Sequence, residues 1–382
     1  MTYNTYMKKP TAVHTVDRST ARFGVPDPLE VCNLLADSIP SEALQAAPAI
    51  LDIGQGCCGI SRSVVKRLIN EGYADAYDAM FKLHGIDNNL ALVKKAQRLG
   101  FINSVCADVD DLDASKTYKI IVGNPPYQAP KTANGGKSPQ PLWRKFLVKA
   151  AELVTDGGYV VLLIPSSVAK FHEEGKVSPA LQKVPQLSVL SIRTGMEAYF
   201  NVGTEISLVV FRKAPQSDTI LLNGQPWNWK ETSWVPRITD EKAVALLKKI
   251  FKTKGRLRFV PQYHGKPLTI DVDNSIGAWG MNRGKDYNLQ SLEGYQNKER
   301  KAHLMCCEFT SAAERDAALT LFQSPVYRFL KSMLMFGSDV AYVTLSSLPI
   351  PDGWQNLTSP DEVAGLFGLT EAEVELLSQF GN

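Results

Sequence analysis

The sequence of 382 residues has no apolar run that approaches the roughly 20 residues needed to cross a membrane. Its first residues, MTYNTYMKKPTAVH, contain nothing like the apolar segment of a secretory signal peptide. Both absences argue against a secreted protein or one that spans a membrane. We therefore expect a cytoplasmic protein without a membrane partner.

Metal-binding and disulfide patterns are missing as well. The six cysteines include two adjacent pairs but no CxxC motif, so their spacing predicts neither a zinc site nor a disulfide framework. Free cysteine packs as a small hydrophobic residue, and we expect reduced, partly buried thiols and no bound metal. These residues are Cys32, Cys57, Cys58, Cys106, Cys306 and Cys307.

The sequence also has no strong excess of one charge. Its 42 Lys and Arg residues and 39 Asp and Glu residues give a net charge of +3, which neither requires nor excludes a polyanionic partner. With 44% hydrophobic residues the chain can bury a large core, and its length favours two domains. The distribution of charge along the chain is therefore more informative than the total.

Short apolar segments alternate with helix-like segments from Ala49 to Lys213. This alternation is typical of a parallel sheet that is covered by helices on both faces. The predicted strands are AILDIG, KLHGID, FINSVCAD, YKIIVG and YVVLLIP, and the predicted helices begin with SRSVVKRL, LALVKKAQ and PLWRKFLV. We therefore predict an α/β fold with a Rossmann-like, mostly parallel sheet.

The last two predicted strands, 187–195 and 206–213, break this pattern. Only MEAYFNVGTE separates them, whereas a parallel crossover needs about a dozen residues or more and usually a helix. The short connection is rich in turn-forming residues and favours an antiparallel hairpin. We therefore expect one antiparallel strand at the edge of the sheet.

A change in composition after Lys213 predicts a domain boundary, with one domain at 1–214 and an α+β domain at 215–382. Segments such as APQSD and NGQPWNWKETSW are loop-like, and no βαβ alternation follows them. From Lys242 to Arg258 the sequence has seven Lys or Arg residues and no acidic residue. Such a cluster can contact phosphate groups, although lysines on the solvated face of an ordinary amphipathic helix give the same pattern.

Acidic residues follow three successive predicted strands. Asp52 opens the turn DIGQG, in which Gly54 and Gly56 let the backbone approach a ligand closely. Asp87 can accept hydrogen bonds from ribose hydroxyls, and Asp108 can accept them from the exocyclic amine of adenine. Each acid alone is more typical of a helix N-cap, but ligands of open α/β sheets bind where the carboxyl ends of the strands meet. Together these residues predict a site for a cofactor that carries a nucleoside.

The fourth strand ends in Asn124, Pro125, Pro126 and Tyr127, on the same edge of the sheet. The two prolines fix φ and remove backbone donors, so the segment is rigid. The side-chain carbonyl of Asn124 and the backbone carbonyl of Pro125 can accept two hydrogens from a planar NH₂ group, and Tyr127 can stack on a base. No His or Glu in the motif can act as a general base. The alternative is a rigid turn in which Asn124 is an N-cap.

These motifs resemble those of S-adenosyl-L-methionine-dependent N6-adenine DNA methyltransferases of the Asn-Pro-Pro-Tyr type. The resemblance covers about residues 20–213. It implies that the glycine-rich turn holds the methionine part of the cofactor, that Asp87 holds the ribose and that Asp108 holds the adenine. The cofactor-binding residues it implies are Phe23, Val25 and Pro26 of the segment ARFGVPDPLEV, together with Asp52, Gly54, Gly56, Asp87, Asp108 and Asn124.

The sequence departs from the family pattern at two positions. Cys58 stands where the family has the third glycine of its turn, and Gly59 follows one residue later. Val25 stands where the family usually has threonine, so the contact made by the hydroxyl is lost.

The order of the motifs resembles the gamma subclass, in which the target-recognition domain follows the catalytic domain. Predicted strands and helices fill the segment between Asp52 and Asn124, so a recognition domain must come after Lys213. The resemblance implies transfer of a methyl group to an adenine flipped out of double-stranded DNA, by a monomer in a bacterium or a phage-infected cell. A separate restriction endonuclease is a candidate partner. The expected DNA-binding residues are Lys252, Lys254, Arg256, Arg258, Arg283 and Lys285.

Other acceptors remain open, because the same tetrapeptide occurs in RNA adenine methyltransferases and in enzymes that methylate a glutamine amide of proteins. The glutamine enzymes carry their extra domain before the catalytic domain, which disfavours that alternative. A nucleotide-binding oxidoreductase would explain the glycine-rich turn but not the tetrapeptide. A DNA-binding module with an inactive site would have no need of the intact motif.

Overall fold

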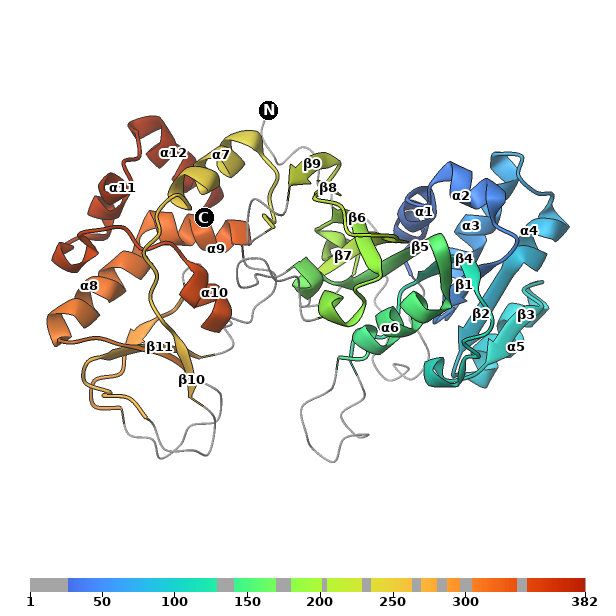
Figure 1. Ribbon diagram of the computed structural model, residues 1–382, viewed down its shortest axis with the longest axis horizontal. Coiled ribbons are helices and arrows are strands. Elements are labelled where there is room, and N and C mark those ends of the chain that lie inside the picture. Colours follow the sequence, from blue (N-terminus) through green and yellow to red (C-terminus); the bar gives the residue numbers. More distant parts are fainter. Residues whose placement is uncertain are drawn as a thin grey trace. The chain divides into compact units, whose positions relative to one another are not determined.

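The computed structural model of the chain divides into two units, which are described separately (Figure 1). The first comprises Met1–Val168 and Pro179–Asn228, and the second comprises Ala169–Ser178 and Trp229–Asn382. The structure describes residues 27–128, 141–169, 180–200, 205–228, 235–262, 269–279, 287–295, 304–334 and 342–381.

A nine-stranded sheet forms the centre of the first unit, with the order β3-β2-β1-β4-β5-β7-β6-β8-β9. Strands β3, β2, β1, β4 and β5 are mutually parallel, as predicted. The strands are β1 (Ile50–Ile53), β2 (Leu83–Asp87), β3 (Asn103–Cys106), β4 (Tyr118–Gly123), β5 (Val154–Pro165), β6 (Leu187–Arg193), β7 (Ile206–Lys213), β8 (Thr219–Leu222) and β9 (Gln225–Asn228). The chain leaves β1 toward β2 on one side and later returns to β4 on the other, so the strand order reverses between β1 and β4.

Helices on both sides of this sheet bury its apolar residues. Alternate residues of β4 and β5, among them Val122, Val161 and Leu163, share one hydrophobic cluster with the first helices of the chain. The neighbouring residues of these strands point to the opposite face, where α6 contacts β5. The helices are α1 (Leu29–Asp37), α2 (Ser41–Ala46), α3 (Gly59–Asn70), α4 (Ala76–Lys82), α5 (Leu90–Arg98) and α6 (Trp143–Leu153).

The predicted hairpin is present, but its reversed strand is not at the edge of the sheet. Strand β7 runs antiparallel to both β5 and β6 and lies between them. Its first six residues are all buried, so this strand needs a hydrogen-bonding neighbour on each side and helices over each face. Strand β6 follows β7 in the strand order and pairs with β8 on its other side, and the sheet remains mostly parallel.

The segment after Lys213 continues the sheet, although its sequence is loop-like. Strand β8 pairs in parallel with β6, and β9 returns antiparallel to β8. Asn223 and Gly224 form the two-residue turn between them with φ of 49° and 84°, a conformation that Asn-Gly pairs favour. The boundary between the two units therefore falls after Asn228 rather than at 214.

The second unit combines a small antiparallel sheet with helices, in agreement with the predicted α+β class. The sheet has four strands in the order β10-β13-β11-β12. These are β10 (Val260–Gln262), β11 (Ser275–Trp279), β12 (Gln290–Ser291) and β13 (Leu304–Glu308); the helices are α7 (Glu241–Ile250), α8 (Ala312–Gln323), α9 (Pro325–Leu334), α10 (Tyr342–Ser347), α11 (Val363–Leu366) and α12 (Glu371–Phe380). Phe259, Tyr287 and Tyr327 pack edge-on around Phe322 and form part of its core. None of the helices described in either unit is long and apolar enough to span a membrane.

Candidate cofactor and catalytic site

A cavity of about 360 Å³ opens at the carboxyl ends of β1, β2, β3 and β4. This is the edge at which the strand order reverses, where open α/β sheets bind their ligands. Of the predicted site residues, Gly54, Gly56, Asp87, Asp108, Asn124 and Pro126 line it. Asp27, Lys145 and Phe146 also line it and were not predicted from the sequence.

The glycine-rich turn is shaped by the end of β2. The backbone N–H groups of Gly54 and Gln55 both donate to the carbonyl of Ile86, which folds the turn over the neighbouring strand. Gly54 and Gly56 have φ of 89° and 53°, values that favour glycine. Cys58, at the position of the missing third glycine, also has a positive φ of 63°. The turn therefore keeps the conformation that glycine would allow, at the cost of backbone strain at Cys58.

Asp52 lies beneath this turn and is completely buried. Its Oδ2 accepts a hydrogen bond of 2.6 Å from the hydroxyl of Ser61, which in turn accepts one of 3.1 Å from the side chain of Gln55. Its Oδ1 has no hydrogen-bond partner among the described residues. Burial, with a smaller contribution from the nearby carboxylates of Asp27 and Asp87, raises the pKa of Asp52 to about 7, although the hydrogen bond from Ser61 opposes this shift. Asp52 thus lies close enough to two other acidic groups to be repelled by both.

Asp87 connects the end of β2 to the glycine-rich turn. Its Oδ2 accepts a hydrogen bond of 3.0 Å from the backbone N–H of Gly56, and its Oδ1 accepts one of 2.8 Å from the N–H of Asn89. These two bonds fix the carboxylate at the cavity wall, and each oxygen keeps a lone pair for a further donor.

Asp108 lies at the end of the site formed by β3. Its Oδ1 accepts the backbone N–H of Asp110 at 3.1 Å and thereby caps the short 3₁₀ helix Val109–Asp111. The same oxygen lies 2.9 Å from Nζ of Lys145 on α6, which also pairs with Asp110 at 2.6 Å. The hydrogen bond from Lys145 holds the pKa of Asp108 below its usual value. No local pattern in the sequence predicts that a residue of α6 pairs with this acid.

The Asn-Pro-Pro-Tyr segment follows β4 directly and enters the site beside β1. A Cβ atom at Gly123 would lie 2.5 Å from the carbonyl oxygen of Ile53, so only glycine allows the two strands to approach this closely. Pro125 is buried, whereas Pro126 is exposed at the cavity wall. Tyr127 is half-buried and packs against the hydrophobic cluster of the first unit.

Asn124 joins two residues that the sequence does not place together. Its side-chain nitrogen donates to Oδ1 of Asp27 at 2.7 Å, and its side-chain oxygen accepts the hydroxyl of Tyr127 at 2.8 Å. Burial raises the pKa of Asp27, although the hydrogen bond from Asn124 opposes this shift. Asp27 belongs to the segment ARFGVPDPLEV, whose Phe23, Val25 and Pro26 lie outside the described residues. The contact between Asp27 and Asn124 was not predicted, because no local pattern links residues that are 97 positions apart.

The predicted basic residues belong to the second unit, between α7 and β10. Lys252, Lys254, Arg256 and Arg258 are all exposed. Arg256 folds back, since its guanidinium donates to the carbonyls of Thr253 and Gly255. The other two predicted residues, Arg283 and Lys285, lie outside the described residues.

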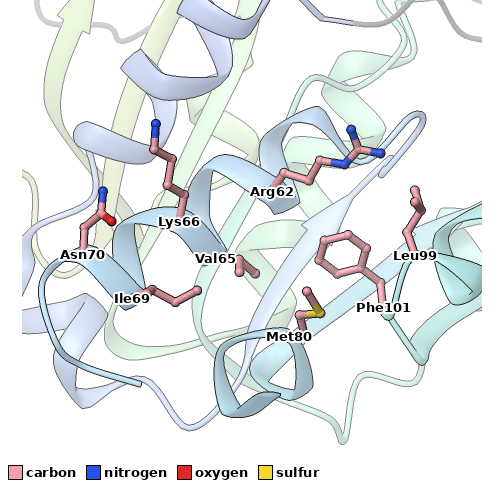
Figure 2. A pocket seen from close by; sticks show the side chains of 8 residues that line it. All are labelled: Arg62, Val65, Lys66, Ile69, Asn70, Met80, Leu99 and Phe101. Atoms are coloured by element: carbon pink, nitrogen blue, oxygen red, sulfur yellow. The ribbon is translucent and has the colours of Figure 1, made fainter. Parts of the chain in front are cut away.

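A second cavity, of about 350 Å³, lies among α3, α4 and the end of α5 (Figure 2). Its apolar lining comes from Val65, Ile69, Met80, Leu99 and Phe101, and Arg62, Lys66 and Asn70 of α3 complete it. None of the predicted site residues lines it. Its lining also has no carboxylate, so it does not share the chemistry of the first cavity.

The family model described as Eco57I restriction-modification methylase matches residues 60–183, and no curated protein gives a significant match. A protein assigned as a modification subunit of a type I restriction enzyme from Vibrio vulnificus has a TM-score of 0.41 and 13% identity, over 53% of this chain and 47% of that one.

Two further solved structures show a similar level of likeness. The type IIG restriction endonuclease BpuSI has a TM-score of 0.44 and 15% identity, over 65% of this chain and 38% of that one. A protein assigned as a class I S-adenosylmethionine-dependent methyltransferase from Listeria monocytogenes has a TM-score of 0.40 and 16% identity, over 53% of this chain and 68% of that one. The chain thus spans less than half the length of both restriction-modification proteins.

Proposed function

We propose that the protein is an S-adenosyl-L-methionine-dependent methyltransferase that modifies the N6 amine of adenine in duplex DNA. The observation that carries the proposal is that Asn124 lines the same cavity as Gly54, Gly56 and Asp87. A group that can bind a planar amine therefore faces the residues suited to a nucleoside cofactor. The match to a restriction-modification methylase family supports DNA as the substrate.

The acidic residues of the cavity suit this cofactor. We propose that the cofactor is S-adenosyl-L-methionine, which when bound supplies a sulfonium methyl group that is already activated for transfer. The carboxyl groups of Asp27 and Asp87 line the cavity and that of Asp52 is buried close to both, so the site favours a ligand with positive charge. The buried Oδ1 of Asp52 has no hydrogen-bond partner among the described residues. We assign the methionine part to the glycine-rich turn and the ribose to Asp87. The exposed oxygens of Asp108 suit the adenine, and Phe23, Val25 and Pro26 complete the proposed contacts.

The Asn-Pro-Pro-Tyr tetrapeptide positions the amine that accepts the methyl group. The side-chain oxygen of Asn124 and the carbonyl of Pro125 accept the two hydrogens of the amine, which favours its lone pair as the nucleophile. Tyr127 stacks on the extruded base, and such stacking contributes roughly 1–3 kcal/mol per base. Pro126 keeps the segment rigid, so little conformational freedom is lost when the base binds.

We assign DNA binding to the second unit. Its exposed cations Lys252, Lys254 and Arg258, with Arg256, Arg283 and Lys285, supply sequence-independent phosphate contacts. We further propose that the protein acts as a monomer and that a separate restriction endonuclease recognises the same DNA sequence.

The test is methyl transfer from labelled S-adenosyl-L-methionine to unmethylated duplex DNA, followed by sequencing that maps N6-methyladenine. We expect label at adenines within one short sequence context. Label that appears only in RNA, in cytosine or in a glutamine of a protein would show that the proposed substrate is wrong and would identify the actual one. An Asn124→Ala preparation that binds the cofactor is the control for a contaminating methyltransferase.

A further inference from the structure

Three side chains at the carboxyl end of β4 form a continuous hydrogen-bonded chain. Asp27 accepts from the side-chain nitrogen of Asn124 at 2.7 Å, and the side-chain oxygen of Asn124 accepts from Tyr127 at 2.8 Å. Asp27 and Asn124 line the cavity, and Tyr127 is half-buried, with part of its side chain packed against the hydrophobic cluster. The two hydrogen bonds of Asn124 therefore fix the plane of its amide at the cavity wall.

The carboxylate of Asp27 determines the orientation of the Asn124 amide, that is, whether its nitrogen or its oxygen faces Asp27. An ionised carboxylate can only accept hydrogen bonds, so it selects the nitrogen of Asn124 and turns the oxygen away. Tyr127 donates to that oxygen, which has two lone pairs and can still accept a hydrogen from an amine. Without Asp27, a half-turn of the amide would exchange its two ends and would present a donor to the substrate.

Asp27 has no evident structural role that would explain its position instead. It immediately precedes Pro28, the N-cap of α1, yet no side chain caps this helix. The carboxylate is removed from solvent, which is unfavourable for a charged group unless it has a partner. Its charge also lies near the carboxyl group of Asp52, and among the described residues Asn124 supplies the side-chain hydrogen bond that favours the charged form of Asp27.

We propose that Asp27 is a positioning residue, which holds the Asn124 amide with its oxygen toward the amine that receives the methyl group. This inference rests on the proposed function, because it concerns the same site. It differs from a role in which Asp27 only attracts the positively charged cofactor. Attraction of the cofactor depends on the negative charge of Asp27. Positioning of Asn124 depends instead on the oxygen of Asp27 that accepts the hydrogen bond.

The two variants Asp27→Asn and Asp27→Ala separate these roles. Asn keeps an accepting oxygen and removes the charge, whereas Ala removes both. Positioning predicts that Asp27→Ala lowers kcat about 100-fold, the loss expected from a misplaced reacting group, and that Asp27→Asn restores most of it. Charge attraction predicts that both variants weaken cofactor binding equally and leave kcat unchanged, and this result would overturn the proposal. Glu30→Gln removes an exposed carboxylate on α1 and is the matched control with unchanged kcat.

A second measurement needs neither cofactor nor substrate. In a ¹⁵N spectrum, the side-chain amide protons of Asn124, assigned with Asn124→Asp, should show the downfield shift of a hydrogen bond to a carboxylate. We expect this shift to disappear in Asp27→Ala and to diminish in Asp27→Asn, while the melting temperature confirms that the variants fold. An Asn124 amide signal that is identical in all three proteins would also overturn the proposal. If the amide responds but no methyl transfer to any substrate occurs, the proposed function fails, and what stands is that Asp27 orients the Asn124 amide.

Discussion

The edge of the sheet in the first unit and the basic segment of the second unit were both predicted from sequence, but on different grounds. At the sheet edge, Gly54, Asp87 and Asn124 follow separate parallel strands, and the geometry of such strands requires their ends to meet. In the basic segment, Lys252 and Arg256 have only their positive charge in common. Both are exposed, and the side chain of Arg256 folds back to donate to the backbone carbonyl of Thr253. A residue type becomes a site when the backbone topology gathers it with others, and charge alone does not do this.

The largest effect that would test this comparison is expected at Asn124. Asn124→Ala removes the acceptor for the amine without touching the glycine-rich turn, so we expect methyl transfer to fall by about 10³-fold or more. Cofactor binding, measured by calorimetry, should change by less than about tenfold. A variant that loses cofactor affinity and transfer in parallel would show that Asn124 serves the cofactor alone.

Gly123 tests how closely β4 must approach β1. In Gly123→Ala the new Cβ meets the carbonyl of Ile53, and the strands must separate at a cost of about 1–3 kcal/mol, as in other overpacked cores. Urea denaturation should show this loss together with weaker cofactor binding. Gly365→Ala in α11 is the matched control, because a Cβ there meets nothing within 4 Å. Equal stability of the two variants would mean that the strand ends adapt easily.

The pH dependence of stability provides a test of the buried acid. Since the pKa of Asp52 is raised from 3.8 to about 7, the folded protein binds more protons than the unfolded chain between these values. This residue therefore makes the protein less stable as pH rises from about 4 to 7, with no further change above that range. We expect Asp52→Asn to remove this contribution, as measured by urea denaturation at pH 5, 6, 7 and 8. A variant whose stability follows the same pH curve as the parent would contradict the assignment.

The smallest effects are expected in the basic segment. Substituting Lys252, Lys254 or Arg258 by Ala should reduce the slope of log K against log salt for duplex DNA by about 1 each, uniformly across sequences. Fluorescence anisotropy at several salt concentrations measures this slope. Lys249→Ala is the control, because Lys249 already pairs with Glu373 at 2.6 Å. If the control and the three variants behave alike, the segment does not contact phosphates and the comparison between the two regions becomes sharper still.

The fold of the first unit was largely predictable for two reasons. Its strands are apolar, and the length of each connection indicates whether the next strand runs parallel or antiparallel. The β8–β9 hairpin was missed, since Pro226 and Trp227 in a polar context are typical of a loop and only pairing with β6 makes the segment a strand. Asp52 was predicted to contact the cofactor, but it is completely buried, and its carboxyl group accepts a hydrogen bond from Ser61. These features require contacts between segments that no local pattern encodes.

By itself, the sequence determined which residues end the parallel strands, because apolar runs mark the strands and the chain direction places their carboxyl ends on one edge. Only the tertiary structure decided that Asp27 orients Asn124 across 97 positions and that Lys145 of α6 neutralises Asp108. The physical reason is that periodicity and turn chemistry act over a few residues, whereas hydrogen bonds and ion pairs between distant segments form only after the chain has packed.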